Sequence, residues 1–168
     1  MILVYAFSNQ WGTNIARRTL SQLKDKLNSP DIVFLPVYFH PRQFFKKYIE
    51  HNIYSLVIGL GDGPRYLNRI NIETQAKNAY HDQTIYPFSP IFLDLSLPNV
   101  DIYDSNHFKI SSNMGTYNCN WLAYSTELSL NRRHLSTHHL FFHLPPKSPA
   151  DFLASNIYRI LAENKLIG

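Results

Sequence analysis

Short apolar runs alternate with segments of helical periodicity along most of this 168-residue chain, and this alternation limits the folds open to it. Three runs, Met1–Phe7, Ile32–Val37 and Leu56–Ile58, have the length and composition of buried strands. After the first run, apolar residues recur at helical spacing, with Leu20 and Leu23 on one face. Alternating strands and helices predict an α/β fold, here an α/β/α sandwich around a mainly parallel or mixed twisted sheet.

The chain has one cysteine, Cys119, which lies where the spacing of apolar residues changes from that of a strand to that of a helix. Before it, Phe108–Ile110 is a short strand-like run, and after it apolar residues recur at helical spacing from Trp121 to Leu130. Gly115 permits the sharp turn between the two. We therefore expect the thiol in the first turn of a helix, where free N–H groups lower a thiol pKa and can bind an oxyanion. The alternative is a small buried apolar residue.

Three stretches of the sequence together resemble one enzyme family. Gly115–Asn120 resembles the nucleophile motif of the pyrrolidone-carboxylate peptidases, which are also called pyroglutamyl peptidases type I. Phe142–Pro145 resembles that family's histidine motif, and Ile70–Asn78 resembles its glutamate motif. The resemblance covers most of the chain. It implies a cysteine-type omega-peptidase that removes N-terminal pyroglutamate from peptides by thiolate attack.

The resemblance implies a catalytic triad of Cys119, His143 and Glu73. The interval of 24 positions between the cysteine and the histidine is similar to that in the family. In thiol hydrolysis the cysteine is the nucleophile, the histidine takes and returns its proton, and the carboxylate accepts the second imidazole N–H. Strand alternation places Glu73 on the opposite face from Ile70 and Ile72. The Cys119 N–H is the expected oxyanion donor, and the chemistry requires neither a metal ion nor a cofactor.

The resemblance also implies the residues that bind the substrate. In the family, two phenylalanines after the first strand sandwich the pyrrolidone ring; here Phe7 matches the first, and Trp11 stands in place of the second. The intervening Ser8–Gln10 departs from the family pattern, and an arginine of the family's site corresponds to Gln83, which lacks the charge. Two alternatives stay open: a thiol amidase that acts on another small N-terminal cap, and a catalytically silent member that binds a ligand in the same crevice.

Two features favour other kinds of site, but less strongly. Gly59–Pro64 is rich in glycine but lacks the P-loop and dinucleotide signatures, so we interpret it as a loop that borders a ligand crevice at a strand end. Four histidines fall within ten residues: His134, His138, His139 and His143. Their spacing matches no zinc motif, so we expect surface histidines that lead into a strand, with a metal site as the weaker alternative.

Length and composition limit the number of domains, the cellular compartment and the partners of this chain. We expect a single domain over residues 1–168. One cysteine precludes an intramolecular disulfide, which fits a reducing cytoplasm. The formal charge is +4, but no run of Lys or Arg exceeds two, so we expect no nucleic-acid partner. No run reaches the roughly 20 apolar residues of a membrane helix, and we expect neither membrane association nor a signal peptide. The expected partner is a small peptide substrate, and a homo-oligomer is left open.

Residues 81–107 are interrupted by three prolines, and within them Ile91–Leu95 is predicted to be extended. The resembling family carries an additional helix before the nucleophile strand. Residues 99–106 show no helical stripe, so we expect a compact loop there and a more open rim of the crevice.

Overall fold

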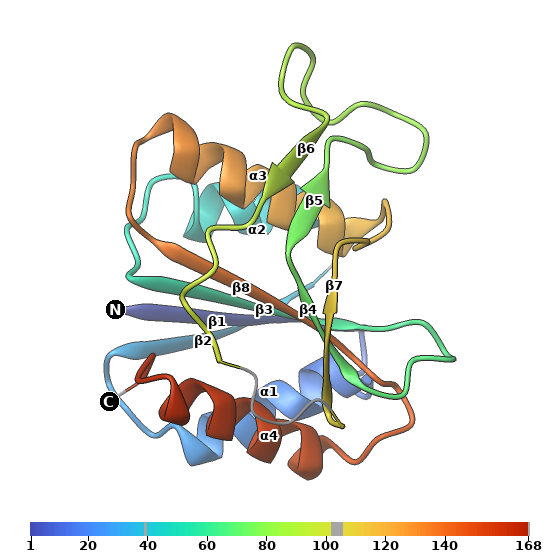
Figure 1. Ribbon diagram of the computed structural model, residues 1–168, viewed down its shortest axis with the longest axis vertical. Helices are drawn as coiled ribbons and strands as arrows, with labels where there is room; N and C mark the ends of the chain where they lie inside the picture. Colours follow the sequence, from blue (N-terminus) through green and yellow to red (C-terminus); the bar gives the residue numbers. More distant parts are fainter. Residues whose placement is uncertain (39, 102–105, 168) are drawn as a thin grey trace.

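The computed structural model describes residues 1–38, 40–101 and 106–167, which form three layers (Figure 1). In chain order, the elements are β1 (Ile2–Phe7), α1 (Ile15–Lys26), β2 (Ile32–Val37), α2 (Pro41–Tyr48), β3 (Leu56–Asp62), β4 (Ile70–Glu73), β5 (Gln75–Lys77), β6 (Phe92–Asp94), β7 (Phe108–Ser111), α3 (Asn118–Arg132), β8 (His138–Leu144) and α4 (Ala150–Glu163). Helices α1 and α4 cover one face of the main sheet, and α2 and α3 cover the other.

The main sheet has the strand order β2-β1-β3-β8-β4-β7. β1 pairs in parallel with β2 and β3, and β3 pairs in parallel with β8. β4 runs antiparallel to β8, and β7 runs parallel to β4. β5 and β6 form a separate antiparallel pair, whose connecting loop projects beyond α3 (Figure 1). The predicted α/β/α sandwich around a mixed, mainly parallel sheet is confirmed.

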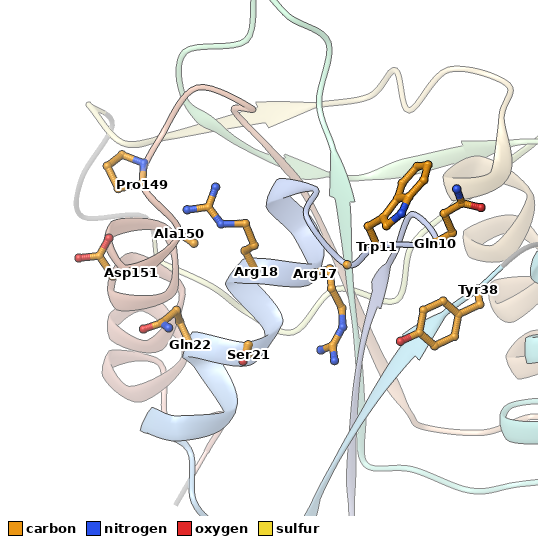
Figure 2. Close-up of a pocket in the computed structure, with 11 residues that line it drawn as sticks. Gln10, Trp11, Arg17, Arg18, Ser21, Gln22, Tyr38, Pro149, Ala150 and Asp151 are labelled. Carbon is orange, nitrogen blue, oxygen red and sulfur yellow. The ribbon is translucent and has the colours of Figure 1, made fainter.

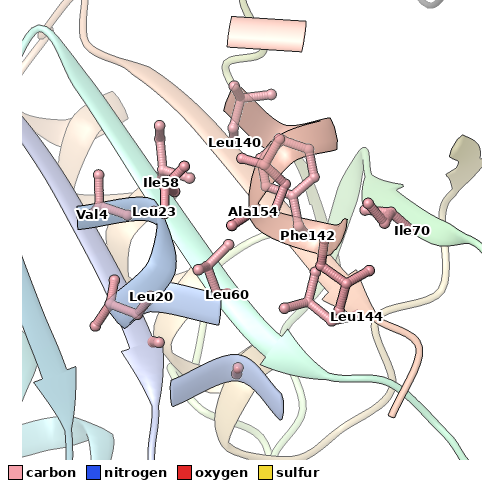
Figure 3. Packing of buried hydrophobic residues seen from close by; sticks show 14 of the residues in the cluster. Val4, Leu20, Leu23, Ile58, Leu60, Ile70, Leu140, Phe142, Leu144 and Ala154 are labelled. Atoms are coloured by element: carbon pink, nitrogen blue, oxygen red, sulfur yellow. The ribbon is translucent and has the colours of Figure 1, made fainter. Parts of the chain in front are cut away.

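Alternation along β8 divides the core between the two faces of the sheet. Leu140, Phe142 and Leu144 pack with Ile70 of β4 on the face covered by α1 and α4 (Figure 3). Phe141 packs on the opposite face, in the cluster to which α2 and α3 contribute. A shift of one residue in register would exchange the two sets of side chains, so burial of both faces specifies how β8 is placed.

β3 is longer than the sequence predicted and includes most of the glycine-rich segment. The prediction ended the strand at Ile58 and placed a loop at Gly59–Pro64, whereas the strand continues to Asp62. That prediction was wrong because a glycine here permits close packing inside the sheet: a Cβ at Gly59 would lie 2.4 Å from Cδ2 of Phe141.

The predicted compact loop lies only partly within the described residues. Residues 99–101 and 106 belong to no helix or strand, and residues 102–105 lie outside the described part of the chain. The run predicted to be extended, Ile91–Leu95, contains β6. No helix among the described residues is long and apolar enough to cross a membrane.

Candidate active site

His143 and Glu73 form a buried pair at the centre of the candidate site. β4 runs antiparallel to β8 with Asn71 opposite His143, so Glu73, two residues further along, lies on the same face as the imidazole. Nδ1 of His143 lies 2.8 Å from Oε1 of Glu73. Glu73 is fully buried and His143 is 8% exposed. Because a carboxylate only accepts, Nδ1 carries the proton, and Nε2 of the neutral ring is left as the base.

Cys119 lies in the first turn of α3, as the sequence predicted. Four residues earlier, Gly115 adopts a φ of +78°, a left-handed conformation that costs glycine little. The first four N–H groups of a helix have no partner within the helix, so the N–H of Cys119 points out of the first turn as a donor for an anion. Cys119 as a residue is partly exposed, and its Sγ is directed toward Gly61 of the sheet.

Gly61 of β3 provides the space in which the thiol and the imidazole meet. It lies opposite His143 in the parallel pairing of β3 and β8. A Cβ at Gly61 would lie 2.7 Å from Sγ of Cys119 and 3.1 Å from Cδ2 of His143. The two reactive side chains therefore lie next to one another over this glycine, although no hydrogen bond joins them, both being among the described residues. The sequence analysis missed this role of Gly61, for which the available signal was a glycine inside a strand.

Burial raises the pKa of the Cys119 thiol well above its ordinary value, and the negative charges of Asp62 and Glu73 raise it further. The N–H of Cys119 itself lowers this pKa, but by less. The predicted low thiol pKa is therefore wrong for the thiol by itself, because burial outweighs the start of the helix. A thiolate here requires an adjacent proton acceptor, and His143 lies in that position.

Asp62, at the end of β3, connects the site to the start of α1. Its Oδ1 accepts the N–H of Ala16 at 2.9 Å and the side-chain N–H of Asn14 at 3.2 Å. Asn14 occupies the N-cap position of α1, but its side chain makes no capping bond and instead donates to the carbonyl of Phe7 at 2.9 Å. A carboxylate supplied by a distant strand replaces the local cap, and sequence periodicity carries no signal for such a long-range contact.

No family model and no curated protein matches the sequence, but the structure matches solved structures of one group of enzymes. Pyrrolidone carboxyl peptidase from Fervidobacterium islandicum AW-1 has a TM-score of 0.81 at 18% identity, over 99% of each chain. Pyroglutamyl peptidase I from Bacillus amyloliquefaciens has a TM-score of 0.76 at 17% identity, over 96% of this chain and 92% of that chain. Pyrrolidone carboxyl peptidase from Thermococcus litoralis has a TM-score of 0.75 at 17% identity, over 98% of this chain and 92% of that chain. The chain has the fold of the pyrrolidone carboxyl peptidases.

Within this peptidase fold, Asn120 holds the β5–β6 segment against the start of α3. Its fully buried side chain accepts the N–H of Lys77 at 2.8 Å and donates to the carbonyls of Lys77 at 2.8 Å and Ala79 at 2.7 Å. The N–H of His81 donates to the carbonyl of Thr116 at 2.7 Å. The sequence analysis assigned no role to Asn120. An asparagine in the first turn, directly after the nucleophile candidate, was the available signal.

The two aromatic residues predicted to bind the pyrrolidone ring, Phe7 and Trp11, lie in different surroundings. Phe7, at the end of β1, packs against the same apolar cluster as Cys119. Trp11 lies on the following loop and is 76% exposed, at the edge of a groove that it shares with Arg17 (Figure 2). Phe7 and Cys119 thus border one apolar cluster, and the sandwich of a ring between Phe7 and Trp11 stays a prediction.

Gln83 lies in the loop between β5 and β6. Its backbone pairs with Tyr80 in a tight turn, and its side chain is exposed. The hydroxyl of Tyr80 donates to Oδ1 of Asn118 at 3.0 Å, one residue before the cysteine. The turn that carries Gln83 is therefore anchored beside the nucleophile candidate, and its role in substrate binding stays a prediction.

The histidine-rich segment does not assemble into a cluster. His139 is fully buried and its Nδ1 lies 3.2 Å from Oε2 of Glu127, so the prediction of a surface position is wrong for this residue. The imidazole faces inward because strand alternation places it on the same side of β8 as Phe141. Among the described residues, no group of three or more His, Cys, Asp or Glu side chains is placed to hold a metal ion.

Proposed function

We propose that this protein is a cysteine peptidase of the pyroglutamyl-peptidase type, which removes N-terminal pyroglutamate from peptides. One arrangement carries the proposal: Sγ of Cys119 lies next to the imidazole of His143, which is hydrogen-bonded to Glu73. The fold shared with pyrrolidone carboxyl peptidases supports it, as does the match of the same three residues to the family's motifs.

In the first step, Nε2 of His143 takes the proton of the Cys119 thiol while the sulfur bonds to the carbonyl carbon of the pyroglutamyl residue. Transfer and attack are coupled because burial raises the pKa of the thiol. Glu73 accepts the Nδ1–H and stabilises the imidazolium that forms. The carbonyl oxygen becomes an oxyanion, which accepts the N–H of Cys119.

In the second step, the tetrahedral intermediate collapses and the C–N bond breaks. The leaving amine takes the proton from Nε2 of His143, and a pyroglutamyl thioester stays on Cys119. Water then attacks the thioester, with Nε2 taking a proton from the water and returning it to the departing sulfur. One amide bond and one water thus give free pyroglutamate and a peptide with a new amino terminus.

A neutral lactam suits the surroundings of the thiol better than a charged ring does. Phe7 offers an apolar surface in the cluster against which Cys119 packs. A prolyl substrate has a ring of the same size, but it carries a charged amine and lacks the lactam oxygen. Burying that charge without a partner costs several kcal/mol, so we expect a pyroglutamyl amide to react on the order of a thousandfold faster than a prolyl amide.

The test is hydrolysis of a fluorogenic pyroglutamyl amide beside the matching prolyl amide, by the wild-type protein and by Cys119→Ala. The proposal expects cleavage of the pyroglutamyl amide only, with no turnover by the variant. Cleavage of neither amide would contradict the proposal, and binding of free pyroglutamate without cleavage would then favour a silent ligand-binding protein. Cleavage of a different N-acyl cap in preference to pyroglutamate would favour the thiol amidase.

A graded test is Gln83→Arg, which should raise the rate of pyroglutamyl amide hydrolysis if a positive charge at this turn helps the reaction.

A further inference from the structure

A groove of about 680 Å³ runs over the outer side of α1 (Figure 2). Trp11, on the loop after β1, lies at one side of it, and the start of α4 at Pro149–Asp151 lies at the other. Arg17 and Arg18 project from α1 between these two borders. The groove lies on the face of the sheet opposite to the cluster that contains Cys119.

The two arginines give the groove its charge. Neither Arg17 nor Arg18 forms an ion pair with another described residue, and the acidic side chain in the lining is that of Asp151. Asp151 occupies the first turn of α4, where a carboxylate stabilises the positive end of the helix. The carboxylate of Asp151 thus has a local role in α4. The guanidinium groups of Arg17 and Arg18 are therefore available to an anionic ligand.

The exposed indole of Trp11 lies beside these two arginines and limits which class of anionic ligand the groove suits. Trp11 is 76% exposed and offers a large flat aromatic surface at the edge of the groove. Tryptophan and arginine are both enriched among the residues that contribute most to binding between proteins. A nucleic-acid backbone would need a longer track of basic groups, and no run of Lys or Arg in this chain exceeds two. An acidic peptide matches both the charge and the aromatic surface.

One hydrogen-bond network connects the groove to the candidate active site. Asn14, at the start of α1, donates to the carbonyl of Phe7 at 2.9 Å and to Asp62 at 3.2 Å. Asp62 directly follows Gly61, over which Sγ of Cys119 lies. Because β1 and β3 are parallel neighbours, the loop that carries Trp11 begins at the same edge of the sheet as the thiol.

We propose that this groove binds an acidic stretch of the peptide substrate, in the part of the chain that follows the pyroglutamyl residue. The inference rests on the proposed function for the identity of the ligand as a substrate, and on the groove itself for the preference for acidic residues. Arg17 and Arg18 supply the charge selection, and the indole of Trp11 supplies contact area.

The experiment measures binding in the full-length Cys119→Ala protein, which leaves the peptide intact. Two fluorescent decapeptides share an N-terminal pyroglutamyl residue and differ only in that the acidic residues of one are amides in the other. Fluorescence anisotropy should show the acidic peptide binding about tenfold more tightly, because each arginine contributes a partly exposed charge pair. The further change Arg17→Gln with Arg18→Gln should abolish that preference. The control Lys24→Gln with Lys26→Gln, which removes the same charge from the last turn of α1, should retain it.

Equal affinity for the two peptides would overturn the proposal, as would an equal loss in the arginine and lysine variants. A single-stranded oligonucleotide that binds the groove more tightly than the acidic peptide would overturn the assignment to peptides. Hydrolysis of the small pyroglutamyl amide by the wild-type protein separates this inference from the proposed function. An arginine-dependent preference without hydrolysis supports the groove and contradicts the function, whereas hydrolysis without a preference contradicts the groove alone.

Discussion

β8 carries two histidines that each pair with a buried glutamate, four residues apart on the same face. Nδ1 of His143 lies 2.8 Å from Glu73, and Nδ1 of His139 lies 3.2 Å from Glu127. Both glutamates are almost completely buried. By residue type and geometry alone, either pair could orient an imidazole as a general base.

The surroundings distinguish the two pairs. His143 lies at the end of the strand, next to the thiol of Cys119. Nε2 of His139 is buried without a hydrogen-bond partner among the described residues, and Glu127 also accepts the N–H and the hydroxyl of Ser96. The comparison teaches that a histidine–carboxylate pair becomes a candidate for catalysis through a neighbouring nucleophile and access for substrate. The His139 pair instead links α3 to β8 and to the segment around Ser96.

The largest expected effect is on turnover. His143→Ala should lower kcat/KM for the pyroglutamyl amide about 10³- to 10⁴-fold, because the thiol loses its proton acceptor and the leaving amine loses its acid. The change also leaves the fully buried carboxylate of Glu73 without its partner, so turnover is compared per folded molecule, with urea unfolding as the control. Folded His143→Ala protein that keeps wild-type turnover would contradict the catalytic role of this pair.

The second prediction concerns the other pair and is about stability. His139→Ala should lower the free energy of unfolding by about 3–5 kcal/mol, because it leaves the buried carboxylate of Glu127 without its partner. Urea denaturation measures this loss. The double change His139→Leu with Glu127→Leu should recover most of it, since two apolar side chains need no partner. A loss below about 1 kcal/mol in the single variant would show that the pair does not hold α3 to β8.

Two glycines of β3 separate an effect on the site from an effect on the core. Gly61→Ala places a Cβ 2.7 Å from Sγ of Cys119, so the thiol must move and kcat/KM should fall about 10²-fold. Gly59→Ala places a Cβ 2.4 Å from Cδ2 of Phe141, so it should destabilise the fold by about 1–3 kcal/mol through overpacking. Activity per folded molecule should stay closer to the wild type in Gly59→Ala. The reverse ranking of the two variants would refute the placement of the thiol.

The smallest expected effect is a dependence of stability on pH. Burial by itself raises the pKa of Glu127, but the hydrogen bond and charge of His139 outweigh it, together with Ser96, so the net pKa is lowered. A lowered folded-state pKa contributes stability above the unfolded value near 4.5, which is lost as the pH falls through the folded-state pKa. The urea midpoint of the wild type should therefore fall on acidification, and this fall should be shallower in Glu127→Gln. Parallel curves for the two proteins would contradict the assignment.

Local sequence patterns predicted much of the fold, whereas the three members of the candidate triad came from the resemblance of three motifs to one family. Strand alternation placed Glu73 away from Ile72, and Gly115 marked the turn before the cysteine. These features depend on neighbours along the chain, so the sequence carries them directly.

The remaining features depend on contacts between distant segments. Asp62 caps α1 from another strand, and Gly59 lies in a strand because Phe141 fills the space above it. The direction of the thiol pKa shift was mispredicted, since burial depends on how α3 packs over β3 and not on the residues beside Cys119. The predictions made from the sequence were wrong at the features that depend on such long-range contacts.

The central claim is that His143 activates Cys119, and the most direct test is the pH dependence of alkylation of the native protein by iodoacetamide. With a single cysteine in the chain, each modified molecule reports this thiol alone. The account predicts that the wild type reacts readily near neutral pH, and that His143→Ala reacts only at a pH well above the ordinary thiol pKa, because burial then acts unopposed. His139→Gln should retain the neutral reaction. A wild-type thiol that resists alkylation until the protein is denatured, or that reacts equally well in His143→Ala, would contradict the account.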